Sequence, residues 1–356
     1  MGKEVTMKKL ETATDGNHIV EIERSNIDVL FDQRTYIKFD RVMLVTHPGV
    51  FHGDDVAATA IWRIALSIWQ PTATIDVFRT TETCWDVLVR RGTNYRVDVP
   101  EMIAVIQYDI GGKDFDHHGT TDEFHPTTVG TNCEVKYAAF GKIWRAIGKV
   151  LLWDTSADAF ERQLVIPFDA QDTGAYGNPL SLLISQFNPN WDDSQDAEYR
   201  NDQFNEVVDL VQRMFVQWFD REESTHKAED IVRRFVAQSD DPKVLLMPTY
   251  VPTGRLLVDE FPEVLLTVSP SIRDTGVWNL NCVRKNPDEF GNKINLPKRW
   301  LENPPEGCTF CHKERFVAAF ETQTDALNAA QLAIKEAYKV VDLRDAKKYD
   351  DYVELI

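Results

Sequence analysis

Two adjacent histidines behind a carboxylate are the part of this sequence best suited to chemistry. The run is Asp116-His117-His118, and two neighbouring imidazoles after an aspartate cannot share one ordinary apolar core face. Neutral imidazole is the commonest protein ligand for a transition metal. A metal site is therefore the first hypothesis for this stretch.

Further histidines and aspartates stand where loops should follow strands or helices. In open α/β sheets, ligands bind beside the carboxyl ends of the strands. A mixed set of imidazoles and carboxylates without thiolates favours Mn²⁺, or Mg²⁺ where carboxylates dominate, over a cysteine-type zinc site. The candidate metal ligands are His47, His52, Asp54, Asp109, His117 and Asp172.

This number of ligands suits two ions that share one carboxylate. Two ions held roughly 3.5 to 4 Å apart bind both the attacking water and the leaving oxygen of a phosphoester, and they lower the pKa of that water. The pattern therefore predicts metal-dependent hydrolysis of a phosphoester.

Strand and helix patterns alternate around these residues. Strand patterns occur at 41–46, 74–78 and 102–108, and helix patterns lie between them at 56–69 and 83–91. Such alternation predicts a parallel sheet with flanking helices.

The remainder of the chain is first helical and then mixed. Helix patterns occur at 134–152, 157–166 and 197–220, strand patterns at 244–246, 264–268 and 277–283, and a last helix pattern begins near 324. The expected fold class is α/β, with a parallel-sheet domain and a smaller α+β C-terminal domain.

Four segments are expected from these shifts in pattern. They are a polar N-terminal extension or edge element at 1–36, a metal-binding catalytic domain at 37–195, a helical connector at 196–240 and a substrate-binding domain at 241–345.

The composition limits where the protein can reside and what it can bind. The 356 residues are 43% hydrophobic, carry a formal charge of −18 and include five cysteines. No apolar run suits a membrane span, residues 1–26 lack the apolar core of a secretory signal, and an odd cysteine count favours a reducing compartment. We expect a cytoplasmic protein without a membrane partner, or a nuclear or mitochondrial one in a eukaryote; a homo-oligomer is left open.

The acidic charge also limits nucleic-acid binding. It opposes general adhesion to duplex phosphate, so a nucleic-acid substrate needs metal ions or a few placed cations. Arg284, Lys298 and Arg299 belong to the concentrated basic patches of the second domain and are candidate phosphate contacts. A solvated rim is an equally good interpretation of these patches.

The motifs resemble those of the DHH phosphoesterase superfamily, named for the triplet that stands here at 116–118. The first motif is similar to Thr46-His47-x4-His52-x-Asp54-Asp55, the second to Tyr108-Asp109-Ile110-Gly111-Gly112 and the fourth to Gln171-Asp172-Thr173-Gly174. Blocks at 187–191, 278–283 and 296–300 resemble the MYG family within it, a family of predicted metal-dependent hydrolases whose eukaryotic members are described as 3′-to-5′ RNA exonucleases. The resemblance covers about residues 41–340.

The resemblance implies a role for each matching residue. It places His47 and His52 on one metal, Asp109 as the bridging carboxylate, and Asp54, His117 and Asp172 on a second metal. His118 would contact the scissile phosphate and Asp116 would orient an imidazole; with Asp55 they are the candidate catalytic residues.

Two departures from the superfamily pattern concern the charge of the site and access to it. His52 stands where most DHH enzymes have an aspartate, a variation that the MYG family shares. A Gly-Gly segment that admits substrate phosphate is replaced by Ala318-Ala319, whose methyl groups could narrow that approach.

The run Cys308-Thr309-Phe310-Cys311-His312 has the short spacing of a haem attachment or of half a zinc site. We favour thiols inside a sheet instead, because the chain shows no export signal and no second cysteine pair follows. The family resemblance places His312 near the substrate.

The favoured function is phosphodiester hydrolysis with two Mn²⁺ or Mg²⁺ ions, as a 3′-to-5′ exonuclease on short or single-stranded RNA. One alternative is a phosphomonoesterase or pyrophosphatase that acts on a small phosphorylated molecule. The other is a metal-stabilised binding protein without turnover.

Overall fold

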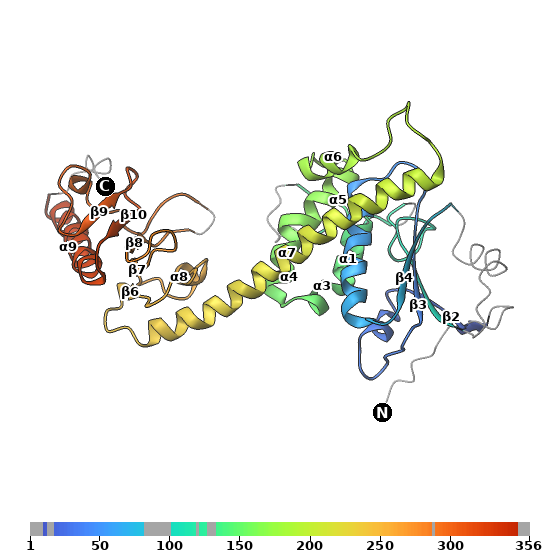
Figure 1. The fold of residues 1–356 in the computed structure, drawn as a ribbon, viewed down its shortest axis with the longest axis horizontal. Helices are drawn as coiled ribbons and strands as arrows, with labels where there is room; N and C mark the ends of the chain where they lie inside the picture. Colours follow the sequence, from blue (N-terminus) through green and yellow to red (C-terminus); the bar gives the residue numbers. More distant parts are fainter. Residues whose placement is uncertain are drawn as a thin grey trace. The chain divides into compact units, whose positions relative to one another are not determined.

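The computed structural model describes residues 10–12, 18–81, 101–118, 121–126, 133–286 and 289–347 (Figure 1). The helix predicted at 83–91 lies outside the described residues. The chain divides into two compact units, Met1–Asp220 and Arg221–Ile356. Among the described residues, none of the helices combines the length and the apolar character that a membrane crossing requires.

A five-stranded sheet forms the centre of the first unit. Its strand order is β1-β2-β5-β3-β4, and four strands are parallel because β2 pairs with β5, and β3 with both β5 and β4, in the same direction. The bounds are β1 Leu10–Thr12, β2 His18–Ile22, β3 Arg41–Thr46, β4 Thr74–Arg79 and β5 Met102–Gln107. The α/β fold class is thereby confirmed.

The N-terminal segment, which was expected to be an extension or an edge element, takes part in this sheet. β2 lies beside β5, and the 3-10 helix η1 (Ile27–Leu30) buries Leu30 completely. The side chain of Gln70 binds this region, because its Nε2 donates to the carbonyl oxygens of Leu30 at 3.0 Å and Ile37 at 2.9 Å. Backbone pairing and core contacts, which need no long apolar run, hold residues 18–39 in place.

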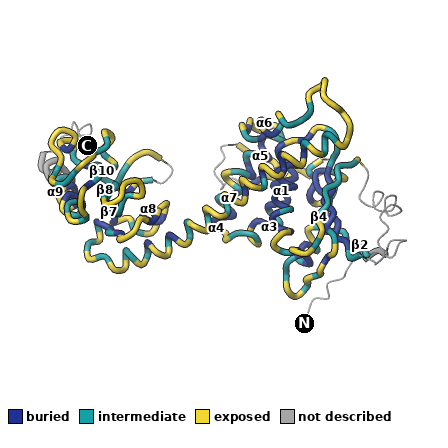
Figure 2. Tube along the Cα trace, viewed as in Figure 1, coloured by how far each residue is buried: buried dark blue, intermediate teal, exposed yellow. Residues whose placement is uncertain are grey.

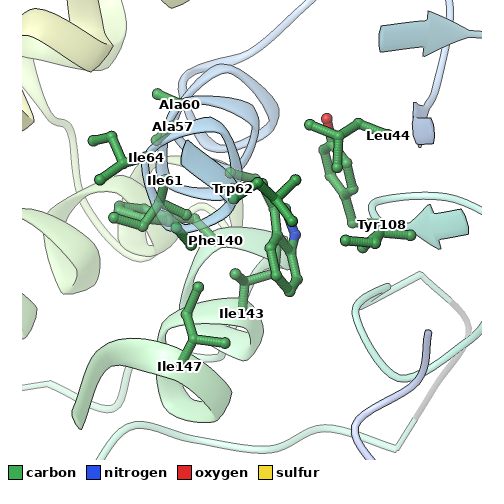
Figure 3. Packing of buried hydrophobic residues seen from close by; sticks show 14 of the residues in the cluster. Leu44, Ala57, Ala60, Ile61, Trp62, Ile64, Tyr108, Phe140, Ile143 and Ile147 are labelled. Atoms are coloured by element: carbon green, nitrogen blue, oxygen red, sulfur yellow. The ribbon is translucent and has the colours of Figure 1, made fainter. Parts of the chain in front are cut away.

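Helices cover the sheet and carry most of the first core. α1 (Gly53–Trp69) begins at a capping box between His52 and Asp55 and is buried almost throughout its first three turns. It packs against α3 (Ala139–Leu151). Figure 3 shows this packing, in which the labelled residues are Leu44, Ala57, Ala60, Ile61, Trp62, Ile64, Tyr108, Phe140, Ile143 and Ile147. Each fully buried large side chain contributes about 1.5–3 kcal/mol.

Short helices follow α3 and lead to the last ligand candidate. α4 (Asp154–Phe160) continues through a π-helical segment, η3 (Glu161–Val165), directly into α5 (Ile166–Asp172). α6 (Pro179–Ser185) follows and contacts α1. The helix predicted at 157–166 thus extends further, and Asp172 stands at its C-terminus.

α7 (Ala197–Ala237) is longer than its predicted pattern at 197–220. Its first half contributes Phe204 and Phe215 to the core of the first unit. Its second half contributes Ala228 and Val232 to a core cluster of the second unit.

The second unit is a mixed sheet with a helix against it. The order is β6-β7-β8-β10-β9, antiparallel except for the parallel pair β6 and β7. The elements are β6 Val244–Leu246, α8 Leu256–Asp259, β7 Leu266–Pro270, β8 Trp278–Cys282, η4 Lys298–Leu301, β9 Cys308–Cys311, β10 Val317–Phe320 and α9 Gln323–Lys347. Figure 2 shows buried positions gathered in each unit around its own sheet, as expected for the predicted α+β domain.

Candidate metal centre

Two neighbouring strands bring the first ligand candidates together. β3 and β5 are adjacent and parallel, with Val45 opposite Gln107, so the residues that follow both strands emerge at one edge of the sheet. His47 follows β3 and Asp109 follows β5, and His47 Nε2 lies 3.2 Å from Asp109 Oδ2.

The N-terminus of α1 adds three side chains. His52 is the N-cap residue, and Asp55 Oδ1 accepts hydrogen bonds from the backbone N–H groups of His52 at 2.8 Å and Val56 at 2.9 Å. The other oxygen of Asp55 lies 3.2 Å from His47 Nε2. Asp54 and Asp55 are both fully buried, which is unusual for carboxylates without a cation.

The ligand atoms form three groups, each within 4.8 Å, and two of these groups share Asp109. They are His47 with Asp55 and Asp109; His52 with Asp54 and Asp172; and Asp109 with Asp116, His117 and His118. All six predicted ligands belong to these groups, and His117 Nε2, which lies 3.1 Å from Asp172 Oδ2, links the group around Asp109 to the group of His52, Asp54 and Asp172. The structure sets His52 beside Asp54 and Asp172, and its ring centroid lies 5.8 Å from that of His47, with which the family resemblance implied a shared metal.

Asp109 is in the position of a shared ligand. Its Oδ2 faces His47, while its Oδ1 lies 3.4 Å from His117 Nδ1. The residue has a φ of +56°, a backbone conformation that costs a non-glycine residue about 1–3 kcal/mol. The N–H of Asp109 donates to the Phe115 carbonyl at 3.1 Å, which closes the loop and holds this conformation.

His117 joins Asp109 to the second group, because its Nε2 lies 3.1 Å from Asp172 Oδ2. His52 Nδ1 lies 3.6 Å from the other oxygen of Asp172. Burial opposes ionisation of Asp172, but its hydrogen bonds with His117 and Asp54 and the charges of His117 and His52 together outweigh burial and lower its pKa.

The site contains more buried carboxylates than the neighbouring imidazoles can neutralise. Burial, reinforced by the neighbouring Asp109 and Asp172, raises the pKa of Asp54 well above its ordinary value. Burial would lower the pKa of His47, but Asp109 and Asp55 outweigh it and raise that pKa to about 10. The arrangement favours added positive charge, from protons or from a cation.

The donor set fits divalent ions. Neither oxygen of buried Asp54 has a hydrogen-bond donor among the described residues, and an orphaned buried carboxylate is what a bound cation would satisfy. His47 Nδ1 lies 3.0 Å from the Pro48 carbonyl oxygen, so Nδ1 carries a proton and Nε2 faces the carboxylates. The side chains are imidazoles and carboxylates, which are common ligands of divalent metal ions.

Asp116 positions His118. Its Oδ1 accepts from the backbone N–H and from Nδ1 of His118, both at 2.9 Å. Its Oδ2 accepts from the N–H of Gly112 at 2.6 Å. Burial opposes ionisation of Asp116, but these bonds outweigh it and lower its pKa. The His118 side chain is 65% exposed, so it can reach a substrate.

Two further contacts support the ligand loops. Tyr108, fully buried, lies with its hydroxyl 2.6 Å from that of Thr59, which donates to the Asp55 carbonyl at 2.7 Å. The side chain of Asn188 accepts from Phe51 N at 2.9 Å and donates to Phe51 O at 2.8 Å, which fixes the backbone just before His52.

Arg79 was missed by the sequence reasoning. It ends β4 opposite Thr46, its guanidinium donates to the Gly49 carbonyl at 3.0 Å, and it lies 4.4 Å from the ring centroid of Phe204. Burial lowers its pKa although Asp55 opposes that shift. A cation at the end of a strand next to β3 is the signal that could have identified it.

His125 was also missed. Its Nε2 lies 2.8 Å from Asp169 Oδ2 and its Nδ1 lies 2.9 Å from Glu161 Oε1. Asp169 is fully buried and also accepts from Gly141 N at 3.0 Å. This network anchors the helix that ends in Asp172.

The predicted substrate contacts lie in the second unit, at separate places. Arg284 pairs with Asn292 in a β-bridge and lies 5.8 Å from the Phe290 ring centroid. Lys298 and Arg299 are exposed on η4, and Arg299 forms an ion pair with Glu336.

His312 follows β9 beside two exposed aromatic rings. Its ring centroid lies 4.3 Å from that of Phe316 and 6.2 Å from that of Phe310. Cys308 and Cys311 are partly buried free thiols within β9, so the strand interpretation of this run is the one the structure matches. Ala318 and Ala319 lie in β10, between β8 and β9.

Comparisons with known proteins agree over most of the chain. The family model described as "Uncharacterised protein family (UPF0160)" matches residues 43–334. The MYG1 exonuclease of Rattus norvegicus is 26% identical, over 85% of this chain and 87% of that protein. The MYG1 exonuclease of Homo sapiens is 25% identical, over 82% and 85%. A MYG1 protein of Schizosaccharomyces pombe is 23% identical, over 82% and 97%. The resemblance drawn from the sequence motifs is confirmed.

Proposed function

Because the chain belongs to the uncharacterised protein family UPF0160, with relatives named MYG1 exonuclease, we propose that it removes nucleotides from the 3′ end of short or single-stranded RNA. The family and the names of these relatives support a nuclease-like hydrolase. RNA as the substrate and the 3′-to-5′ direction are our proposal.

The proposal depends on one observation: six imidazole and carboxylate side chains lie close together, and one of them, the buried Asp54, has no hydrogen-bond donor among the described residues. Asp109 in the shared position would hold two ions, with Asp55 and His47 on one side and Asp54, Asp172 and His52 on the other. Mn²⁺ or Mg²⁺ bound there would supply a hydroxide at neutral pH and stabilise the charge that develops on the phosphoryl oxygens.

The residues of the chain supply positioning. His118, exposed and held by Asp116, contacts the scissile phosphate and offers a proton donor to its oxygens. His117 joins the two groups through Asp109 and Asp172. Burial of Asp54 and Asp55 keeps water from these carboxylates, which strengthens their pull on a cation.

Single-stranded substrate is supported by two features. A formal charge of −18 opposes binding along a duplex. In the second unit, Phe310 and Phe316 are 51% and 41% exposed beside His312, and exposed aromatic rings are surfaces on which unpaired bases stack.

The test is an end-label assay with Mn²⁺ or Mg²⁺. With 5′-labelled oligoribonucleotide we expect a ladder that shortens from the 3′ end, and no products with Asp109→Asn. Parallel incubations contain the matching oligodeoxyribonucleotide, a 3′,5′-phosphoadenosine nucleotide and pyrophosphate. If only the small molecules are hydrolysed, the protein is a small-molecule phosphatase and not an exonuclease. If the oligonucleotide is bound but nothing is hydrolysed, the protein is a binding protein.

A further inference from the structure

A small cavity adjoins the second ligand group. Its volume is about 260 Å³, and it is lined by His52, Gly53, Phe168, Gln171, Asp172, Ser181, Leu182 and Ser185. His52 and Asp172 belong both to its wall and to the group that they form with Asp54. A molecule in this cavity is therefore in contact with the candidate metal centre.

The lining of the cavity includes Ser181, Leu182 and Ser185 of α6. Leu182 is 61% exposed, and Phe168 and Gly53 also line the cavity. A Cβ on Gly53 would stand 2.5 Å from Ser181 Oγ and 2.9 Å from a Phe168 ring carbon. Glycine at this position lets α6 approach α1 closely enough to form the cavity.

The cavity also offers hydrogen-bond donors without acceptors. Gln171 Oε1 accepts from Asn178 N at 2.8 Å, and Ser181 Oγ accepts from Asn178 Nδ2 at 3.1 Å. Asn178 thus occupies the acceptors of both side chains. The Gln171 amide protons and the Ser181 hydroxyl proton have no acceptor among the described residues, so they can bind a ligand.

Size and charge narrow the choice of ligand. Pockets for drug-sized ligands have volumes of about 300–1,000 Å³, so this cavity suits a single ring system. Its lining contains no lysine or arginine and does contain Asp172, so it does not suit a phosphate. An uncharged ring with oxygen or nitrogen acceptors matches the apolar wall and the free donors.

We propose that this cavity receives the nucleobase of the nucleotide whose phosphate lies at the metal centre. The inference rests on the proposed function and adds to it a site for one base. Gln171 and Ser181 donate to acceptors of the base, and Leu182 covers its face. One base per site agrees with removal of one nucleotide at a time.

The chain provides a matched pair of variants. Leu182 and Leu183 are neighbours on α6 and are 61% and 62% exposed, but only Leu182 lines the cavity. Leu182→Trp should fill the cavity, and Leu183→Trp should add the same surface outside it. Calorimetric titration with Mn²⁺ present would measure binding of adenosine 5′-monophosphate and of ribose 5-phosphate, which lacks the base.

We expect the wild type and Leu183→Trp to bind adenosine 5′-monophosphate about tenfold more tightly than ribose 5-phosphate, the smaller end of what a filled pocket contributes. Leu182→Trp should abolish that preference while its Mn²⁺ content and its affinity for ribose 5-phosphate stay unchanged. Equal binding of both ligands by the wild type, or equal behaviour of the two tryptophan variants, would overturn the inference.

The same proteins separate this inference from the proposed function. A preference for the base that depends on Leu182, in a protein that cuts no oligonucleotide, supports the cavity and rejects the exonuclease. If Leu182→Trp still cleaves the oligonucleotide and the wild type shows no preference for the base, the nucleobase site is wrong and the proposed hydrolase activity stands.

Discussion

Asp54→Asn should stabilise the metal-free protein while it removes metal binding. Asp54 is fully buried, both of its oxygens lack hydrogen-bond donors among the described residues, and Asp172 and Asp109 repel it. An asparagine of the same shape removes the charge and gives Asp172 a donor.

The magnitude follows from the orphaned group. A buried polar group without a partner costs about 1–3 kcal/mol, so the gain should be about 2 kcal/mol. For a unit of this size that corresponds to a rise in Tm of about 4–8 °C. Burial raises the pKa of Asp54 in the folded protein above its ordinary value of 3.8. The charged Asp54 therefore does not destabilise the fold below pH 3.8, and its destabilising effect grows as the pH rises above 3.8. The stability gained by Asp54→Asn should grow over the same pH range.

Thermal unfolding is measured with EDTA and with Mn²⁺ at about 100 times its Kd. Binding at that concentration adds about 3 kcal/mol to the wild type, and this increment should nearly vanish in Asp54→Asn. Asp169→Asn is the matched control: Asp169 is equally buried but paired with His125, so its replacement should destabilise the protein. A lower Tm for Asp54→Asn in EDTA, or an unchanged Mn²⁺ increment, would refute this reasoning.

Three other substitutions test contacts around and beyond the site. Asp116→Asn removes the negative partner of His118 Nδ1; kcat should fall by about 10²-fold with Mn²⁺ content unchanged, and loss of bound Mn²⁺ would show instead that Asp116 holds the ligands. His125→Gln leaves Asp169 and Glu161 without their cation and should cost about 3 kcal/mol. Burial lowers the pKa of His125, but Asp169 and Glu161 outweigh burial and raise that pKa above 6.5. The stability that protonated His125 contributes is therefore complete below pH 6.5 and is lost as the pH rises through its folded pKa. A Tm difference between the variant and the wild type that does not shrink between about pH 6 and about pH 9 would contradict this. Lys293→Met removes an ammonium whose three protons are shared among the carbonyl oxygens of Leu257, Phe261, Pro262 and Val264, which lie at 2.8–3.2 Å; denaturant unfolding of the second unit should show a loss of about 3 kcal/mol, and an unchanged midpoint would show that solvent replaces these bonds.

The strand and helix periods in the sequence placed the main elements, because periodicity depends only on near neighbours. They located β3, β4, β5 and α1 and therefore the loops that carry the candidate ligands. The helix pattern at 197–220 fell short of α7, whose second half is mostly exposed or half-buried, and the polar segment at 1–36 was expected to be an extension or an edge element. Pairing of β2 with β5 joins residues 84 apart in the chain, such as His18 and Met102, and a five-residue strand does not encode such a partner.

The set of six ligand candidates follows from the sequence alone, because motif order and residue type restrict them strongly. How they divide into groups was decided by the tertiary structure. Asp54 and Asp55 are neighbours in the chain, but consecutive residues of a helix point about 100° apart, so Asp54 faces Asp172 while Asp55 faces His47. The pairing of His125 with Asp169, and the cavity between α6 and α1, likewise depend on how separate helices meet. Local patterns specify which chemical groups are available, and only long-range packing decides which of them touch.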